Sequence, residues 1–289
     1  MLSVSVDRLG PPSVRLSLSN RPENVLLVRQ MITGLAEAIQ LETTDLNDIS
    51  TAVTEACNNV VLHAYGGKEG PLEIEIYARL DVIEVVVRDH GTGILPRTDT
   101  TDEAPGIGVP VIRALAQSSE FRNAAGDAGT EVRMEFPTPR VSALEPLPED
   151  EFEMPGIVAT ELASTVEITI APTPLARTIL PRLLSVSAAR AHFTTDRIAD
   201  LQALADALVV NVPGSISGDH LSIGIHVEPH DLELRIAPLR MGRADQLIVD
   251  ASLNDLAPLV DRLTDHQRIA TSGSAPDVEM LALRLIDPR

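Results

Sequence analysis

Two polar residues, Glu55 and Asn59, stand four positions apart in a segment with helical periodicity. Side chains at this spacing lie on the same side of a helix, one turn apart. Carboxylates take part in proton transfer, and carboxamide oxygens can bind hard cations. Such a pair is also common on solvated helix faces, so by itself it is weak evidence for a site. It becomes informative only together with the signals that follow it in the chain.

The second signal is an aspartate followed by two glycines. The β-branched run from Val82 to Val87 predicts a strand, and Asp89, Gly91 and Gly93 come directly after it. A carboxylate at a strand end can accept a hydrogen bond from an exocyclic amine, while glycines let a flat base approach closely. An Asp-x-Gly-x-Gly segment alone more often marks a turn.

The third signal is Gly106-Ile107-Gly108, which leads into an apolar segment that is typical of a helix start. Glycine N–H groups at a helix N-terminus form a cradle for phosphate. Pro110 is tolerated in a first helical turn. The polar residues 95–105 are a candidate lid. Thr130, which follows Gly129 and precedes a predicted strand, is either a further site residue or part of an ordinary hairpin turn.

In this order and at these intervals, the three motifs resemble the N, G1 and G2 boxes of the GHKL (Bergerat-fold) ATP-binding superfamily. Within it they most resemble the bacterial anti-sigma factor serine-protein kinases, in which His-x-Tyr often ends the first box, as in His63-Ala64-Tyr65 here. We expect those last three residues to have a packing role. The resemblance implies an α/β fold, specifically an α+β two-layer sandwich.

The resemblance also implies ATP and Mg²⁺ as cofactors and a role for each matching residue. Glu55 is implied as the catalytic general base and Asn59 as the Mg²⁺ ligand, while Asp89 would read the adenine amino group. The remaining implied nucleotide-binding residues are Gly91, Gly93, Gly106, Gly108 and Thr130. The absence of a Gly-x-x-x-x-Gly-Lys-[Ser/Thr] motif argues against a P-loop.

The function implied is that of a serine/threonine protein kinase that phosphorylates a STAS-type anti-sigma factor antagonist and regulates a sigma factor. An alternative is a non-catalytic ATP-binding switch or scaffold that acts through protein–protein contacts. A third reading is an interaction protein whose nucleotide site has decayed. The intact motifs argue against this reading.

The chain is also expected to contain an internal repeat, with residues 1–140 as the ATP-binding domain and 160–289 as a degenerate copy. Residues 141–159 between them form a linker rich in proline and acidic residues. An offset of about 151 residues places Asp206 opposite Glu55 and Val210 opposite Asn59. The second copy is therefore expected to bind no nucleotide, and to serve as a docking surface or as the partner in an intramolecular pseudo-dimer. A homodimer is the other possibility.

Composition narrows the choice of partners. The net charge of −19 and the absence of Trp argue against nucleic-acid binding. The acidity either favours a partner with a basic surface or simply maintains solubility. No apolar run approaches the roughly 20 residues of a membrane span. A single cysteine, Cys57, excludes an intrachain disulfide, and together these features predict a cytoplasmic protein.

Overall fold

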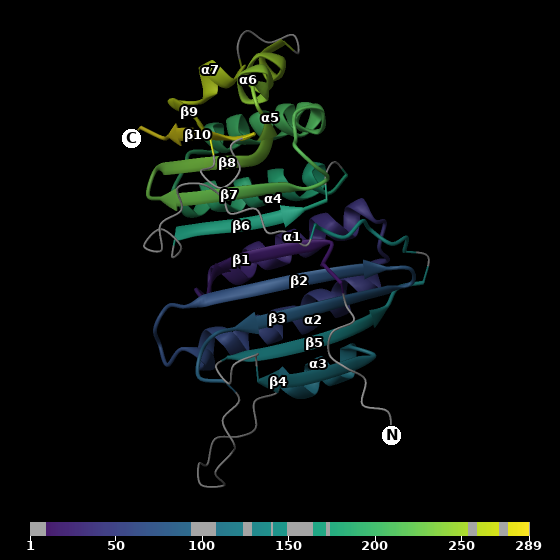
Figure 1. Ribbon diagram of the computed structural model, residues 1–289. Helices are drawn as coiled ribbons and strands as arrows, with labels where there is room; N and C mark the ends of the chain where they lie inside the picture. The colour runs from purple at the N-terminus through teal and green to yellow at the C-terminus, as the bar shows by residue number, and fades with distance from the viewer. Residues whose placement is uncertain are drawn as a thin grey trace.

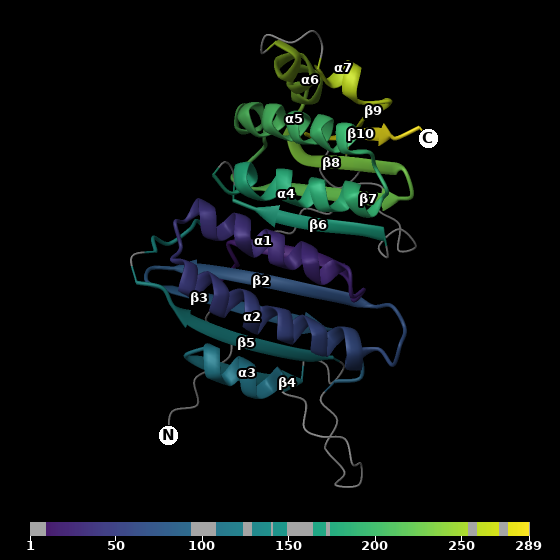
Figure 2. The same cartoon turned by 180° about the vertical axis from the view of Figure 1, so that it is seen from behind.

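The computed structural model describes most of the chain. The residues described are 10–93, 108–123, 129–139, 141–148, 164–171, 174–253, 259–271 and 277–288. Helices cover one face of a single sheet, which gives two layers (Figures 1 and 2). The predicted α/β two-layer fold is therefore confirmed. No helix in these ranges is both long and apolar enough to cross a bilayer.

The first half supplies strands β1 to β5 and helices α1 to α3. Their bounds are β1 (Val14–Ser19), α1 (Asn24–Ala38), α2 (Thr43–Asn59), the π-helix η1 (Val60–Ala64), β2 (Pro71–Arg79), β3 (Val82–Asp89), α3 (Gly108–Leu115), β4 (Ser118–Asn123) and β5 (Thr130–Pro137). Periodicity explains the elements: β1 buries every second residue, from Val14 to Leu18, and α2 buries Ile49, Ala52, Val53 and Ala56.

The second half repeats this order of strands with one more helix before its last hairpin. Its bounds are β6 (Thr165–Ile170), α4 (Pro174–Arg190), α5 (Thr195–Asn211), the 3₁₀ turn η3 (Val212–Gly214), β7 (Leu221–Glu228), β8 (Asp231–Arg240), α6 (Arg243–Leu253), α7 (Leu259–Leu263), β9 (His266–Thr271) and β10 (Val278–Ile286).

The ten strands of the described residues form one antiparallel sheet whose order is β4-β5-β3-β2-β1-β6-β7-β8-β10-β9. Read outward from the centre, the two halves follow the same sequence of strands. The central strands β1 and β6 pair around Leu16 and Ile168, so that Arg15 faces Thr169 on one side and Ser17 faces Glu167 on the other. The sheet is therefore arranged about an approximate two-fold axis near the Leu16–Ile168 pair.

The helices beneath the central strands also meet. Helix α1 packs on α4, and Gly34 of α1 lies directly against the backbone of Ile179. The buried apolar residues of both halves form one continuous core. The division into domains at residues 1–140 and 160–289 stays a prediction, because one sheet and one core continue from one half into the other.

The sheet face opposite the helices carries charged pairs in the first half. Glu75 on β2 contacts Arg15 and Arg88, and Arg88 Nε donates to Glu131 Oε2 at 2.8 Å.

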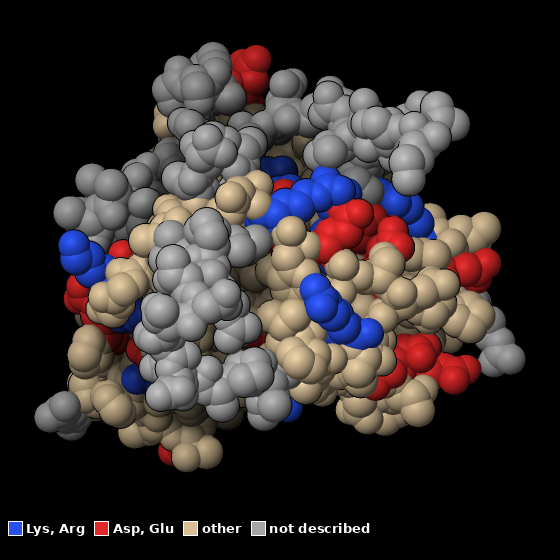
Figure 3. Space-filling view, turned by 90° about the horizontal axis from the view of Figure 1, so that it is seen from below, with Lys and Arg blue, Asp and Glu red and all other residues tan. Residues whose placement is uncertain are grey.

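Figure 3 shows the molecule from the end where β4 lies. Basic side chains stand beside acidic ones there, and the described residues at this end form no continuous basic patch.

Candidate functional site

Helix α2 presents Glu55 and Asn59 on the side away from its fully buried residues. Both side chains are half-buried, and Asn59 is the last residue of the regular helix. The chain continues as the π-helix η1, a type of segment that is frequent at functional sites. At its end, the carbonyl of Ala64 accepts a hydrogen bond from the backbone N–H of Thr92 at 2.9 Å. The end of this helix is thereby joined to the loop that follows β3.

Helix α3 begins opposite these two side chains. A Cβ atom placed on Gly108 would lie 3.1 Å from Glu55 Oε2 and 3.3 Å from Asn59 Oδ1. These distances are tighter than ordinary van der Waals contact, so glycine leaves room here that other residues would fill. Two motifs that are far apart in the sequence therefore meet, and the N-terminus of α3 faces a carboxylate and a carboxamide.

Asp89 ends β3 and is 2% exposed. Its Oδ1 accepts a hydrogen bond from Gly91 N at 2.8 Å, and the described residues offer its side chain no other hydrogen bond. Gly91 is held so close to η1 that a Cβ would lie 2.0 Å from the carbonyl oxygen of Ala64. Only glycine fits this approach, because the obstacle is backbone rather than a movable side chain.

Two further glycines shape the same loop. Gly93 has a φ of +71° and lies against Gly129, whose φ is +88°. A Cβ on Gly129 would lie 1.9 Å from the carbonyl oxygen of Asp89. Thr130 follows as the first residue of β5 and is half-buried. The structure thus brings Asp89, Gly91, Gly93 and Thr130 into one region, whereas Gly106 and the candidate lid at 95–105 lie outside the described residues.

Tyr65 was expected only to pack, but its hydroxyl joins three segments. It accepts a hydrogen bond from His90 N at 2.8 Å and donates one to the carbonyl oxygen of Pro71 at 2.5 Å. Burial raises the pKa of Tyr65, and the charges of Asp89 and Glu73 act in the same direction, so the hydroxyl keeps its proton. The His-x-Tyr pattern could have indicated this residue, but not its hydrogen-bond partners.

Comparison with known proteins shows what this region is similar to. Residues 18–136 match the model of the histidine kinase-like ATPase domain. The serine-protein kinase RsbW of Halalkalibacterium halodurans is 37% identical over 83 residues, which cover 28% of this chain and 49% of that protein. RsbW of Bacillus licheniformis is 33% identical over 89 residues, 30% of this chain and 53% of that protein.

The first half matches a histidine kinase-like ATPase domain. The anti-sigma F factor of Caldanaerobacter subterraneus subsp. tengcongensis is 28% identical over 130 residues, 42% of this chain and 90% of that protein. The resemblance to the GHKL superfamily and its anti-sigma kinases is confirmed, although the chain spans only about half the length of the RsbW proteins it matches. The solved structure of TP0453 in crystal form I covers 99% of this chain and 94% of that one, but at a TM-score of 0.38 and 12% identity it supports no conclusion.

The residues of the ATPase-like half suit a nucleotide with a metal ion. The space beside Gly108 is bounded by a carboxamide oxygen and a helix N-terminus, which are groups that attract a cation and a phosphate respectively. No three His, Cys, Asp or Glu side chains gather as a metal cluster within the described ranges. The Asn59 carboxamide offers one protein oxygen, which suits a metal ion that takes most of its ligands from phosphate and water.

Cys57 lies on the buried side of α2 and takes no part in the site. It is 0% exposed, and burial raises the pKa of its thiol to about 12. The thiolate that acts as a nucleophile is therefore absent at neutral pH.

The second half keeps an asparagine at the position of Asn59 but lacks the carboxylates of Glu55 and Asp89, and the bounds of the helices correct the expected equivalences. Helices α2 and α5 are both 17 residues long and end at Asn59 and Asn211. Asn211 therefore corresponds to Asn59, and Ala207 to Glu55, rather than Val210 and Asp206. The offset between the two helices is therefore one residue larger than the sequence pattern indicated.

Other elements of the second half cover the region that corresponds to the candidate nucleotide site. The β7–β8 hairpin repeats the register of β2–β3, which places Pro238 where Asp89 stands. Helix α6 packs against α5, β8 and β10, with Ala244 and Leu247 fully buried. The carboxylate of Glu279 accepts hydrogen bonds from Gly242 N at 2.8 Å and Ala244 N at 3.1 Å. The start of this helix is thus occupied by an anion from the chain itself.

Proposed function

We propose that the ATPase-like half binds ATP with Mg²⁺ and that the protein is a serine/threonine kinase of the anti-sigma factor type. The observation that carries this proposal is the closeness of Gly108 to Glu55 and Asn59, because a Cβ on Gly108 would lie only 3.1 Å from Glu55 Oε2 and 3.3 Å from Asn59 Oδ1. It puts a helix N-terminus, a carboxylate and a carboxamide around one small space. Relatives named serine-protein kinase and anti-sigma factor support the same reading.

Each residue has a defined task in this proposal. Asp89 is buried at the end of β3, where its carboxylate can accept a hydrogen bond from the adenine amino group. Gly91 and Gly93 leave room for the base, and Thr130 lies beside them. The N–H groups at the start of α3 hold phosphate oxygens. Gly106 would extend this phosphate cradle.

The transfer step depends mainly on position and charge. Asn59 Oδ1 would hold the metal, which neutralises charge on the phosphates when it is bound. Glu55 then accepts the proton of the attacking hydroxyl on the substrate protein. Because Glu55 and Asn59 are one helical turn apart, their side chains lie on the same side of α2 and could serve one bound nucleotide. The rigid core face of α2 keeps their separation constant.

The proposed substrate is a Ser or Thr of a STAS-type anti-sigma factor antagonist, and a sigma factor is a proposed second partner. The net charge of −19 favours partners that present a basic surface. A cytoplasmic location agrees with such partners.

Two measurements test the proposal in sequence. Calorimetric titration of ATP with Mg²⁺ should show one site per chain, and Asp89→Asn should abolish it. Asp206→Asn, an exposed change on α5, is the control that should bind as wild type does. Absence of ATP binding to folded wild-type protein would overturn the nucleotide site.

Phosphate transfer needs its own test. With the cognate antagonist and radiolabelled ATP, wild type should phosphorylate the antagonist, and Glu55→Gln should retain ATP binding but lose transfer by at least about a hundredfold. If Glu55→Gln transfers phosphate as wild type does, Glu55 is not the base.

A second candidate is a non-catalytic ATP-dependent switch. The symmetric pairing of β1 with β6 around Leu16 and Ile168 favours it, because the second half then takes the place of a partner subunit. ATP binding without any phosphate transfer would support this candidate over the kinase. The pseudo-dimer itself predicts a monomer by light scattering, and a symmetric dimer formed through the first half would contradict it.

A further inference from the structure

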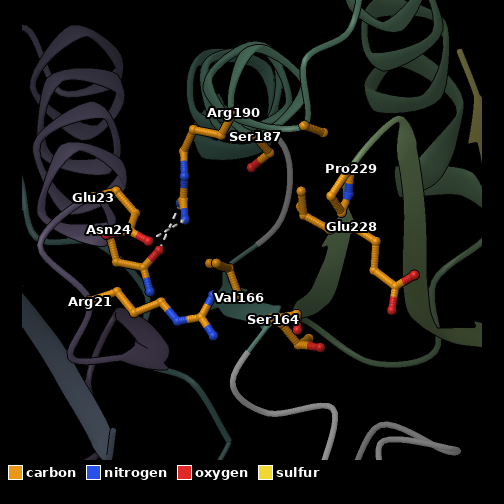
Figure 4. A pocket seen from close by; sticks show the side chains of 12 residues that line it. Arg21, Glu23, Asn24, Ser164, Val166, Ser187, Arg190, Glu228 and Pro229 are labelled. Atoms are coloured by element: carbon orange, nitrogen blue, oxygen red, sulfur yellow. Dashed lines mark hydrogen bonds and ion pairs between the residues drawn. The ribbon is translucent and has the colours of Figure 1, made fainter. Parts of the chain in front are cut away.

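A cavity of about 410 Å³ lies where the two halves of the molecule meet, away from the candidate nucleotide site. Its walls come from the loop before α1 and the first residue of that helix, from the last turn of α4, and from the facing ends of β6 and β7 (Figure 4). Both halves therefore contribute side chains to a single space.

Arg190 enters this cavity from the end of α4 and, among the described residues, donates one hydrogen bond. Its Nη1 donates to Asn24 Oδ1 at 2.7 Å, and its Nη2 forms an ion pair with Glu23 Oε1 at 3.8 Å, which is longer than a hydrogen bond. A guanidinium has five N–H donors. Burial lowers the pKa of Arg190; Glu23 opposes this effect, and the positive charge of Arg21 adds to it.

Arg21 provides a second guanidinium from the opposite wall (Figure 4). It is held in the structure by Glu69, with contacts of 3.0 and 3.1 Å between side chains that are 33% and 52% exposed. An exposed ion pair of this kind contributes at most about 1 kcal/mol, so Arg21 can turn to another anion at small cost.

Ser187 lies one turn before Arg190 on α4 and is the most unusual residue of the cavity. It is 1% exposed, and its Oγ has no hydrogen-bond partner in the part of the chain that the structure describes. Figure 4 shows the side chain on the cavity side of the helix. A buried hydroxyl without a partner is unfavourable, and a ligand that accepts its hydrogen bond would remove the penalty.

We propose that this cavity binds a small phosphate monoester. Phosphate oxygens accept hydrogen bonds from Arg190 and Arg21, as guanidinium groups prefer, and a third from Ser187 Oγ. The positive end of the α1 dipole, at Asn24, adds to the attraction. The volume exceeds that of phosphate alone and leaves space for the organic part of the ester.

The negative charges at the cavity limit rather than prevent this binding. Glu23 competes for Arg190 but already lies beyond hydrogen-bond distance from it. Glu228 is 62% exposed and is directed away from both arginines (Figure 4). Since the walls belong to both halves, a bound ester would join them more firmly.

The test uses inorganic phosphate and glycerol 3-phosphate, with sodium chloride at equal ionic strength as the reference. The thermal midpoint of the full chain should rise with phosphate concentration and saturate. Arg190→Gln should weaken the apparent affinity by about tenfold or more. Arg182→Gln is the matched control, because Arg182 lies on the same helix and pairs with Glu37 of α1 outside the cavity.

Ser187→Ala gives a second, independent result. The variant should be as stable as wild type or more stable without phosphate, because an unsatisfied hydroxyl is removed, yet it should respond less to phosphate. Equal responses in all variants, or no saturable response in wild type, would overturn the proposal. The proposal would also be overturned if Gly108→Ala abolishes the response to phosphate and Arg190→Gln does not, because the phosphate would then lie at the site of the first half.

Discussion

The hydroxyl of Tyr65 stands 2.8 Å from the backbone nitrogen of His90, the residue that follows Asp89. The same hydroxyl reaches the carbonyl oxygen of Pro71 at the start of β2. One oxygen atom therefore joins the end of η1, the first residue of β2 and the loop that leaves β3. The position of the Asp89 carboxylate depends on all three segments.

Replacing Tyr65 with Phe removes this oxygen but keeps the ring, which packs against Gly70. We expect ATP affinity to fall about fivefold to tenfold, since one hydrogen bond of about 1 kcal/mol holds the loop. Tyr77→Phe is the control, because its hydroxyl bonds Glu75 on the sheet face opposite the helices. Calorimetry should separate the two variants, and equal losses of affinity in both would argue against a positioning role.

Gly108→Ala should impair nucleotide binding more than stability. The new methyl group would meet Glu55 Oε2 at 3.1 Å and Asn59 Oδ1 at 3.3 Å, and would press on both side chains that the proposed chemistry uses. We expect a loss of ATP affinity of at least tenfold, with a change in unfolding free energy below about 1 kcal/mol. Gly214→Ala, which would meet no atom within 4 Å, is the control. Wild-type affinity in Gly108→Ala would show that this space does not receive the nucleotide.

Gly34→Ala tests the contact between the halves. In most helices this change stabilises by about 0.5–1 kcal/mol. Here the methyl group would lie 2.8 Å from both Ile179 Cγ1 and the carbonyl oxygen of Thr178. We expect a destabilisation of about 1–3 kcal/mol from overpacking, measured by urea unfolding. A gain in stability would mean that α1 and α4 can separate without cost.

The ion pair between Arg88 and Glu131 predicts a dependence of stability on pH. Burial alone would raise the pKa of Glu131, but the hydrogen bond and charge of Arg88, with the charge of Arg133, hold it below its usual value of 4.5. The contribution to stability is therefore complete above about pH 4.5 and is lost as the pH falls through the lowered value.

Glu131→Gln should accordingly lower the urea midpoint at pH 7, and the difference from wild type should shrink toward pH 3. Glu120→Gln on β4, where the carboxylate is 51% exposed, serves as the control and should change little at either pH. A difference that stays constant with pH would assign the effect to packing rather than to ionisation.

The local elements of this structure could be predicted from the sequence, whereas the contacts between distant segments could not. The spacing of Glu55 and Asn59 and the β-branched run before Asp89 depend on short-range periodicity, which a single chain displays directly. The pairing of Leu16 with Ile168 depends on strands that are far apart in the chain, and no local pattern encodes it.

The register of the second half shows the same limit. Assigning Asn211 to the position of Asn59 required the true bounds of both helices, because an error of one residue in the offset changes every equivalence. The hydrogen bonds of the Tyr65 hydroxyl could not be predicted either, because its partners are backbone atoms of two separate segments.

The pairing of β1 with β6 also has a consequence for how the protein behaves on dilution. Two separate subunits joined in this way would dissociate at low concentration, and their sites would then depend on protein abundance. Here both strands belong to one polypeptide, so their effective concentration is set by the chain and not by the cell. The protein can therefore keep this interface even when very few copies are present.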